Sequence, residues 1–214
     1  MIQIIHTLPK EKWQSVSVKE DNDPIVLLSS AEKLYVANPE VRVRRRLTHM
    51  LENASKNLPD GFCLYVIEGV RTIEDQQKAW DKSYIEIQKE FPDENEEFWQ
   101  HQVGLLVAKP SPLANHNCGG AVDVQLIYKD SDTFVDMGTA AKAGSGYSLT
   151  QMFSENISEM QKKNRAILRD VMEKAGFVWY PGEWWHYCYG DRMWAVYSGR
   201  TECFYGPIQD IKVL

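Results

Sequence analysis

The sequence predicts an α+β fold: a single domain, residues 1–214, with a central, mainly antiparallel sheet flanked by helices. Segments with apolar residues at helical spacing precede and separate short segments rich in β-forming residues, and the last predicted strands follow one another closely. A chain of 214 residues can also bury one sizeable core, and no internal repeat or low-complexity segment indicates a second domain.

The charge balance argues against nucleic-acid binding. Asp and Glu number 30 and Lys and Arg 24, which gives a net charge of −6, whereas nucleic-acid-binding domains carry a basic face. The densest basic run, Arg42 to Arg46, falls in a predicted helix and is typical of a solvated face. No window approaches the roughly 18 apolar residues of a membrane-spanning helix. We therefore expect a soluble chain, unprocessed as written, that binds neither nucleic acid nor membrane, and nothing in the sequence predicts its oligomeric state.

The cysteine pattern favours a reducing environment. Cys63, Cys118, Cys188 and Cys203 form neither a C-x-x-C pair nor a dense framework, which favours free thiols and a cytoplasmic location. A periplasmic or secreted chain that has lost a signal peptide would show the same pattern.

The first third of the chain is predicted to contain an arm, a helix and a strand. Residues 1–37 are expected to form an irregular N-terminal arm with at most short strands, because prolines and a polar cluster interrupt them. Asn38-Pro39-Glu40 resembles a helix start, and the apolar spacing that follows predicts a helix from about Pro39 to Asn57. Residues 62–67 are rich in β formers and predict a strand.

The middle of the chain is predicted to be helical. A second helix should cover about residues 73–89, after a Thr-x-x-Asp capping pattern, and a third should begin at Asp93, the first residue of an Asp-x-x-Glu pattern. The proline-rich residues 109–113 then predict an extended loop.

The last half is predicted to supply most of the sheet. A strand-like run extends from Ala121 to Tyr128, and a turn and a loop up to Tyr147 follow it. Ser158 to Gln161 is a capping-box pattern that starts a fourth helix, which Gly176 ends. Residues 177–197 are expected to form short aromatic strands.

One half of a candidate metal site lies in Asn115-His116-Asn117-Cys118-Gly119-Gly120 and the strand after it. The two glycines let the backbone fold back tightly, and the strand then presents Asp123 where the imidazole of His116 could meet it. Strand alternation places Asp123 on the face opposite Val122 and Val124, which also fits an ordinary solvent-facing aspartate.

The other half would come from Glu183-Trp184-Trp185-His186. A straight strand places Glu183 and His186 on opposite faces, so a shared site requires a bend, which Pro181-Gly182 makes plausible. Two His and one Asp, with a Glu left over, match a zinc ion that keeps one coordination position for water and has a base beside it.

Two other interpretations fit the same residues. His116-x-Cys118 and His186-x-Cys188 each place a nitrogen and a sulfur two residues apart, which could close a four-coordinate structural zinc site. The histidines and cysteines could equally be buried structural residues without any metal.

These motifs resemble those of the zinc-dependent D-alanyl-D-alanine dipeptidases, the vancomycin-resistance type of D,D-dipeptidase. The resemblance rests on His116-x-x-Gly-x-Ala-x-Asp123, Glu183-Trp-Trp-His186-Tyr and Tyr189-Gly-Asp-Arg192. It continues in Glu68-Gly-x-Arg71, Asp136-Met-Gly-Thr139 and Tyr205-Gly206, so it covers most of the chain in the same order. The first fifty residues contribute little to it.

The resemblance implies the compact α+β fold of that family and one zinc ion per chain. It implies that the zinc ligands are His116, Asp123 and His186, that Glu183 is the catalytic base, and that Arg71 stabilises the transition state. It favours the open site over the closed one, because the family motif requires neither cysteine.

The chain departs from the family pattern at three places. Ala114 stands where the family usually has a serine, and Val70-Arg71-Thr72 stands where it usually has Arg-Pro after Gly-Tyr. After Met-Gly-Thr the family carries a Phe-Asp pair, and the matching place holds Ala141 and Lys142. That aspartate is expected to help hold the free ammonium of a dipeptide, which a lysine would repel unless Asp136 or another acid takes over.

The expected function is a zinc metallopeptidase that hydrolyses D-alanyl-D-alanine, or a closely related D-amino-acid dipeptide, with a zinc-activated water. The alternative is a zinc D,D-carboxypeptidase or another peptidoglycan-peptide hydrolase, whose longer substrates need no partner for an ammonium. A non-catalytic, zinc-stabilised binding module is a third interpretation, which the presence of Glu183 and Arg71 disfavours.

Overall fold

The computed structural model describes residues 12–13, 15–111, 114–142 and 147–208. Parts of three predicted segments lie outside the described residues: the start of the N-terminal arm, two residues of the proline-rich loop, and residues 143–146 of the loop after Thr139.

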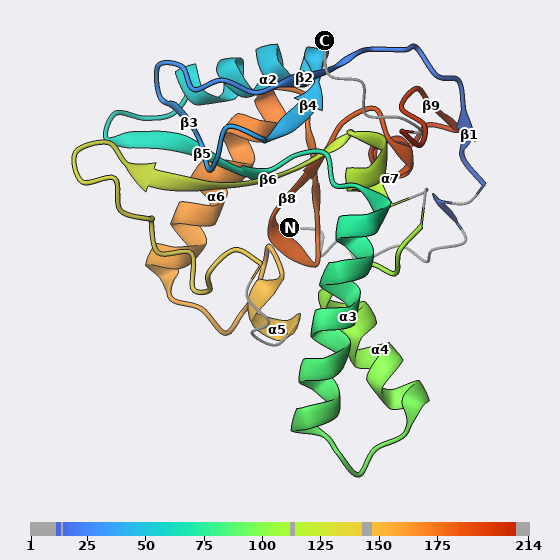
Figure 1. The fold of residues 1–214 in the computed structure, drawn as a ribbon. Coiled ribbons are helices and arrows are strands. Elements are labelled where there is room, and N and C mark those ends of the chain that lie inside the picture. Colours follow the sequence, from blue (N-terminus) through green and yellow to red (C-terminus); the bar gives the residue numbers. More distant parts are fainter. Residues whose placement is uncertain (1–11, 14, 112–113, 143–146, 209–214) are drawn as a thin grey trace.

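A five-stranded sheet forms the centre of the fold, in the order β3-β5-β6-β8-β7. Its strands are β3 (Leu34–Val36), β5 (Phe62–Glu68), β6 (Ala121–Tyr128), β7 (Val178–Tyr180) and β8 (Glu183–Cys188). Every neighbouring pair is antiparallel except β3 and β5, which run parallel. Two small sheets pair β1 (Ser17–Val18) with β9 (Glu202–Cys203) and β2 (Ile25–Leu27) with β4 (Arg42–Arg44). The predicted α+β fold with a mainly antiparallel sheet is confirmed (Figure 1).

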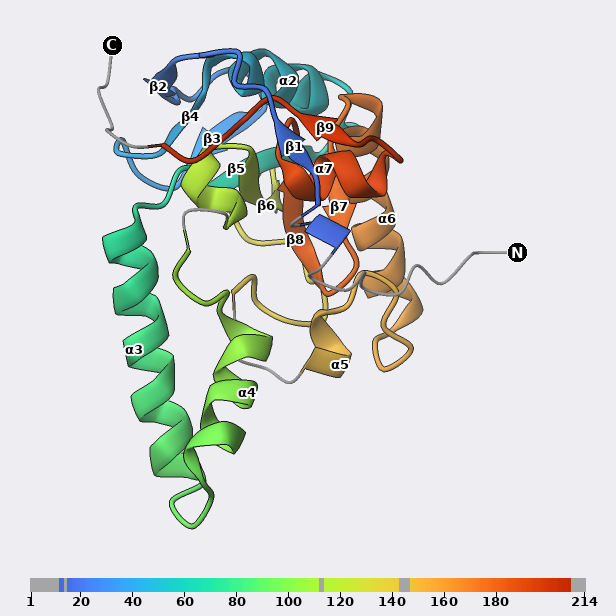
Figure 2. The same ribbon diagram turned by 90° about the vertical axis from the view of Figure 1, so that its right-hand side faces the viewer.

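Helices flank this sheet, and two of them extend away from it. The longer ones are α2 (Arg45–Lys56), α3 (Ile73–Glu90), α4 (Glu96–Leu106) and α6 (Glu159–Lys174), and the short ones are η1 (Asn115–Cys118), α5 (Tyr147–Thr150) and α7 (Arg192–Tyr197). Figures 1 and 2 show α3 and α4 side by side, projecting from the body as a hairpin. Within the described residues, no helix is both long and apolar enough to span a membrane.

Strand β6 separates the core from the candidate site. Its apolar residues Val122, Val124 and Leu126 are fully buried. They belong to one core cluster with apolar residues of α2 and α6, including Leu47, Leu51, Leu168 and Met172. Alternation along the strand turns Asp123 and Gln125 toward the opposite face. These two side chains are also buried, at 2% and 8% exposure, so Asp123 is not an ordinary solvent-facing aspartate.

An irregularity in β5 matters for the site. The register between β5 and β6 shifts between Val66 and Glu68, so that Glu68 pairs with Asp123 while Tyr65 pairs with Gln125. A bulge of this kind inserts one extra residue, here Ile67, and turns the residue after it. Glu68 and Asp123 therefore lie side by side at the end of the two strands.

Two predicted helices match the structure closely. Helix α3 begins at Ile73, and the side chain of its N-cap Thr72 accepts a hydrogen bond from the backbone N–H of Asp75. Helix α6 starts with the predicted capping box, in which Ser158 and Gln161 bond to each other's backbone N–H groups. Gly176 follows it with φ of +100°, a conformation that favours glycine.

The helix expected from Pro39 begins later. Residues 42–44 form strand β4, which pairs antiparallel with β2, and α2 starts at Arg45 without a side-chain cap. The basic run is also not simply a solvated face. Arg44 is 6% exposed, and its guanidinium donates to the backbone oxygens of Cys118 at 3.0 Å, Asp23 at 2.8 Å and Gly206 at 3.2 Å. Pairing with a distant strand outweighs the local helix signal.

Three smaller differences have local causes. Helix α4 begins at Glu96 rather than Asp93, because Asn95 is its N-cap and accepts from the N–H of Phe98. Residues 192–197 form α7 instead of a strand, since Asp191 caps that helix by accepting from the N–H of Trp194 at 2.8 Å. The described part of the arm holds three short strands, and β3 joins the central sheet, which the sequence did not indicate.

The close contact at Gly69 gives a stability prediction. A Cβ there would overlap with the carbonyl oxygen of Arg42 and lie 2.8 Å from a methyl carbon of Val43. Gly69→Ala should therefore lower the free energy of unfolding by about 1–3 kcal/mol, the usual effect of overpacking. Urea denaturation measures this change.

Gly104 provides the matched control. It lies inside α4, and a Cβ there would meet no atom within 4 Å. Gly104→Ala should raise the free energy of unfolding by about 0.5–1 kcal/mol, because alanine is the better helix former. Equal effects of the two substitutions would contradict the close packing at Gly69.

Candidate active site

Three predicted metal ligands converge in the structure. His116 lies on η1, Asp123 on β6, and His186 on β8, where it pairs directly with Asp123. His116 Nε2 is 3.3 Å and His186 Nδ1 is 3.0 Å from the same carboxylate oxygen of Asp123. All three residues are buried, and one donor atom from each lies within 4.8 Å of the others. In the part of the chain that the structure describes, this is the group of His, Cys, Asp or Glu side chains that could hold a metal ion.

The local sequence explains how His116 reaches this position. Gly119 follows η1 with φ of +73°, and a Cβ on Gly120 would lie 2.7 Å from the carbonyl oxygen of Tyr189. The first glycine permits the left-handed turn and the second permits close approach to the chain after β8. Together they fold η1 back onto β6, as the two-glycine pattern predicted.

The hydrogen bonds of His116 suit a metal ligand. Its Nδ1 lies 2.7 Å from the carbonyl oxygen of Gly69. Because a carbonyl only accepts, Nδ1 carries a proton, and Nε2 is the ring nitrogen that faces the Asp123 oxygen. A metal ion that replaces the proton on Nε2 would accept lone pairs from this nitrogen and from the carboxylate oxygen together. Two imidazole nitrogens and one carboxylate oxygen are a donor set that suits zinc with one open position, so the residues fit this ion.

Opposing charges hold the carboxylate of Asp123 ionised. Burial alone raises its pKa, but the charges and hydrogen bonds of His116 and His186 bring the pKa well below its ordinary value. Burial alone lowers the pKa of His186, and the hydrogen bond and charge of Asp123 raise it overall. The two groups stabilise each other's charged forms.

Glu183 lies beside the three candidate ligands. Its Oε2 is 3.9 Å from His186 Nδ1, although the two residues are three apart on one strand. The register between β7 and β8 shifts between Trp179 and Tyr180, next to the start of β8, which supplies the required irregularity. Burial, opposed chiefly by the charge of His186, raises the pKa of Glu183 to about 7. A carboxyl with that pKa can both accept and donate a proton near neutral pH.

Arg71 is held rigidly at the same end of the sheet. Its Nε donates to Glu68 Oε1 at 2.8 Å, its Nη2 donates to the other oxygen of Glu68, and its Nη1 donates to Gln76 Oε1 at 2.8 Å. Burial alone raises the pKa of Glu68, but the bond from Arg71 and nearby positive charge hold it at about 2. The guanidinium carries five N–H groups, so these three bonds leave two for a ligand.

Lys142 also lies at the site. Its ammonium forms an ion pair with Glu68 and is 3.7 Å from Asp123 Oδ2. Asp136, the expected substitute for the missing family aspartate, accepts instead from the N–H of Gly138 and from Gln161, each at 2.9 Å. The sequence thus identified the unusual lysine but not its partner Glu68. The Glu68-x-x-Arg71 spacing could have indicated the ion pair of Glu68 with Arg71, but no local pattern indicates its contact with Lys142.

The cysteines do not complete a four-coordinate site. Cys118 Sγ donates to the carbonyl oxygen of Asn115 at 3.0 Å, and Cys188 Sγ lies 3.3 Å from His186 Nε2, the ring nitrogen that points away from Asp123. Burial raises the pKa of both thiols. The candidate metal group among the described residues includes neither sulfur. Both cysteines fit the role of buried packing residues.

The family model for D-ala-D-ala dipeptidases, of the M15 peptidases, matches residues 46–206. The chain belongs to this family of metallopeptidases. The resemblance seen in the sequence is therefore confirmed, and the match includes every candidate site residue named above.

Several individual members of the D-Ala-D-Ala dipeptidase family are similar to this chain. A D-alanyl-D-alanine dipeptidase of Synechocystis is 34% identical over 177 residues, which cover 72% of this chain and 71% of that protein. The D-alanyl-D-alanine dipeptidase of Enterococcus faecium is 35% identical over 88 residues, 41% of each chain, and that of Enterococcus faecalis is 32% identical over 74 residues, 35% of this chain and 36% of that protein.

Solved structures with a similar chain path include two vancomycin-resistance enzymes. An E175A mutant of the D,D-pentapeptidase VanY in complex with Zn(II) gives a TM-score of 0.48 at 17% identity, covering 89% of this chain and 96% of that one. The D,D-dipeptidase VanXYg in complex with a D-Ala-D-Ala phosphinate analog gives 0.43 at 17% identity, covering 92% of this chain and 72% of that one.

The site geometry predicts which side chains a bound metal ion needs. His116→Ala and His186→Ala should each lose the ion, because each removes one of the three candidate ligands. The measurement is metal content by mass spectrometry after dialysis.

Cys118→Ser and Cys188→Ser are the matched controls and should retain the ion, since neither sulfur belongs to the donor group. Loss of the metal on either serine substitution would instead support the closed His₂Cys₂ site.

Proposed function

We propose that the protein is a zinc peptidase, with one zinc ion per chain, that hydrolyses the peptide bond of D-alanyl-D-alanine or a closely related D-amino-acid sequence. The observation that carries the proposal is the convergence of His116, Asp123 and His186 beside Glu183, a carboxyl whose pKa is raised to about 7. Family membership supports the choice of a D-Ala-D-Ala bond.

In the proposed mechanism, His116 Nε2, a carboxylate oxygen of Asp123 and His186 Nδ1 would hold the zinc ion. When bound, zinc polarises the substrate carbonyl and lowers the pKa of a water molecule to ~7. The carbonyl of Gly69 fixes the tautomer of His116, and the pairing of β6 with β8 fixes the spacing of the other two ligands.

Glu183 moves the proton. It takes the proton of the attacking water and returns it to the leaving amine, which requires a carboxyl that is neither strongly acidic nor always protonated at working pH. Its raised pKa meets that requirement.

Arg71 neutralises the negative charge that develops on the substrate carbonyl oxygen. The guanidinium stays charged throughout, and Glu68 and Gln76 hold it in one orientation, so little reorganisation is needed during the reaction. A non-catalytic binding module would need neither this fixed cation nor Glu183. The cytoplasmic location stays a prediction from the sequence.

A substrate panel tests the proposal. The zinc-loaded protein should release D-Ala from D-Ala-D-Ala, or from a pentapeptide ending in D-Ala-D-Ala, and leave L-Ala-L-Ala intact. Chromatographic detection of free D-Ala measures this. If none of the D-Ala-D-Ala substrates is cleaved, the proposed function is wrong.

The role of Glu183 has its own test. Glu183→Gln should retain zinc but lower kcat by ~10²–10⁴-fold, the usual contribution of general acid–base catalysis. Glu97→Gln, an exposed position in the first turn of α4, is the matched control and should keep the wild-type rate. A Glu183→Gln protein with wild-type kcat would exclude Glu183 as the proton carrier.

The pH profile follows from the same carboxyl. Activity requires the ionised form, so kcat/KM should rise with pH as Glu183 loses its proton. The inflection should lie at or below about 7, the pKa without metal, because a nearby divalent cation favours the carboxylate. Initial rates across the pH range check this, and a profile that falls as the pH rises toward neutrality would contradict it.

A further inference from the structure

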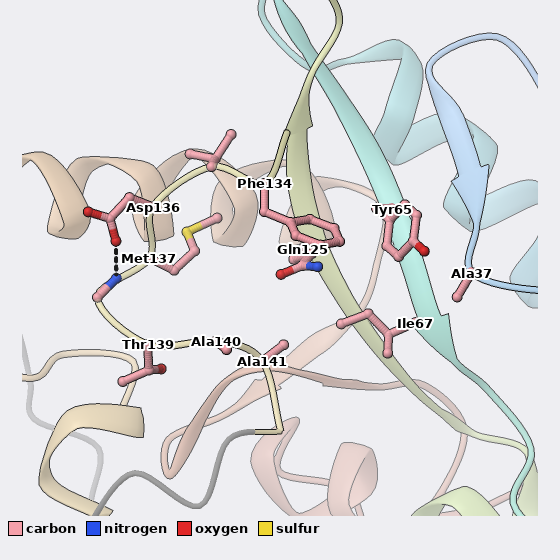
Figure 3. Close-up of a pocket in the computed structure, with 12 residues that line it drawn as sticks. Ala37, Tyr65, Ile67, Gln125, Phe134, Asp136, Met137, Thr139, Ala140 and Ala141 are labelled. Carbon is pink, nitrogen blue, oxygen red and sulfur yellow. Dashed lines mark hydrogen bonds between the residues drawn. The ribbon is translucent and has the colours of Figure 1, made fainter. Parts of the chain in front are cut away.

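A groove of about 620 Å³ lies on the same face of the sheet as Asp123. Figure 3 shows its walls: strands β5 and β6 on one side and the loop of residues 134–141 on the other. Tyr65, Ile67, Gln125, Phe134, Ala140 and Ala141 are among its lining residues. We call it the β5–β6 groove. Its volume falls within the range of about 300–1,000 Å³ typical of small-ligand pockets.

The β5–β6 groove borders the candidate active site, because three of its lining residues lie within two positions of site residues in the chain. Gln125 follows Asp123 by two positions on the same face of β6, and Ile67 directly precedes Glu68. Ala141, in the opposite wall, directly precedes Lys142. The ammonium of Lys142 contacts Glu68 and lies 3.7 Å from Asp123, so this lysine reaches the candidate active site from the end of one groove wall. We call this region, around Lys142 and Glu68, the junction.

The charges at this junction disfavour a second ammonium. Lys142 and Arg71 are both cations, and Glu68 already binds both of them. Asp136 and two acids of the N-terminal arm have other partners: Asp136 binds Gly138 and Gln161, Glu20 binds Arg44, and Asp23 accepts from Tyr205. A free α-ammonium at the junction would therefore meet two cations, and the carboxylate between them is already paired with both. An acylated nitrogen, which is neutral, meets no such repulsion.

The walls of the β5–β6 groove suit a peptide. Tyr65 and Phe134 pack edge to face, with ring centroids 5.3 Å apart, and Phe134 remains 57% exposed. Ile67, Ala140 and Ala141 add apolar surface, and Figure 3 shows the amide of Gln125 on β6, beside the ring of Phe134. An apolar surface with a single side-chain amide can contact aliphatic side chains and bond one peptide group.

We propose that the β5–β6 groove binds the acyl or peptidyl extension of a substrate that ends in D-Ala-D-Ala, and that Lys142 selects against a free α-ammonium. The inference rests on the proposed function and specifies its substrate class: N-acylated or longer peptides rather than the free dipeptide. The reaction is unchanged, because water still cleaves the terminal D-Ala-D-Ala bond and releases D-Ala.

The first experiment compares kcat/KM for D-Ala-D-Ala, N-acetyl-D-Ala-D-Ala and N-acetyl-L-Lys-D-Ala-D-Ala. The wild-type protein should favour both acylated peptides over the free dipeptide by about tenfold or more, the factor expected for one removed charge repulsion in partly solvated surroundings. Lys142→Asp should shift the ratio toward the free dipeptide, and Lys142→Met should shift it less. Equal or better hydrolysis of the free dipeptide by the wild type would overturn the proposal.

The second experiment tests the groove itself. Ala140→Phe fills it from an exposed loop position, so it should lower kcat/KM for N-acetyl-L-Lys-D-Ala-D-Ala more than for D-Ala-D-Ala. Ala31→Phe, an exposed position away from the groove, is the matched control and should change neither value. If Ala140→Phe lowers both values by the same factor, or neither, the groove is not the site of the extension.

A binding measurement separates this inference from the proposed function. Calorimetric titration of the Glu183→Gln protein with the same three peptides needs no turnover. Weaker binding of the lysine-containing peptide to Glu183→Gln/Ala140→Phe than to Glu183→Gln alone supports the groove even if no peptide is cleaved. Equal binding of all three peptides to Glu183→Gln rejects it even if D-Ala-D-Ala peptides are hydrolysed. Circular dichroism confirms that each variant is folded.

Discussion

The site depends on one carboxylate, Asp123, that is almost fully buried between two imidazoles. A buried charge is costly unless it is paired and hydrogen-bonded, and the sheet supplies its partners through strand register. Strand β8 places His186 opposite Asp123, and β5 places Glu68 opposite it on the other side. The order β5-β6-β8 therefore brings the charged groups to the same level of the sheet, and a change in any of these registers would separate them.

Contacts with the N-terminal region hold the segment that carries His116 in place. The carbonyl of Gly69 orients His116, and Gly69 itself packs against the backbone of Arg42 in β4. Two residues further on, Arg44 donates to the backbone carbonyls of Cys118 in η1, Asp23 and Gly206. Residues that bear little resemblance to the family motifs thus fix the segment that carries the first candidate ligand.

Local signals in the sequence predicted what local interactions determine. The caps at Thr72 and Ser158, the strand Ala121–Tyr128 and the turn at Gly119-Gly120 each depend on a few neighbouring residues, and all appear in the structure. The helix expected from Pro39 begins only at Arg45, because residues 42–44 form β4 and pair with β2, residues 25–27. The burial of Arg44 and the contact of Lys142 with Glu68 depend on still more distant segments, which no local pattern in the chain specifies.

The bulge at Ile67 has a consequence for how such a site can change. In a regular strand, consecutive side chains face opposite sides of the sheet, so two side chains on the same face lie two residues apart. A bulge removes this constraint. Here Ile67 lines the β5–β6 groove and Glu68, the very next residue, contacts Lys142 and pairs with Asp123. The side chain that shapes the groove, Ile67, and the side chain that carries charge at the site, Glu68, are thus neighbours in the chain but can be changed separately. Substitution at Ile67 can therefore change the shape of the groove while the ion pairs of Glu68 stay intact, whereas deletion of either residue would restore the regular register and leave one side chain opposite Asp123.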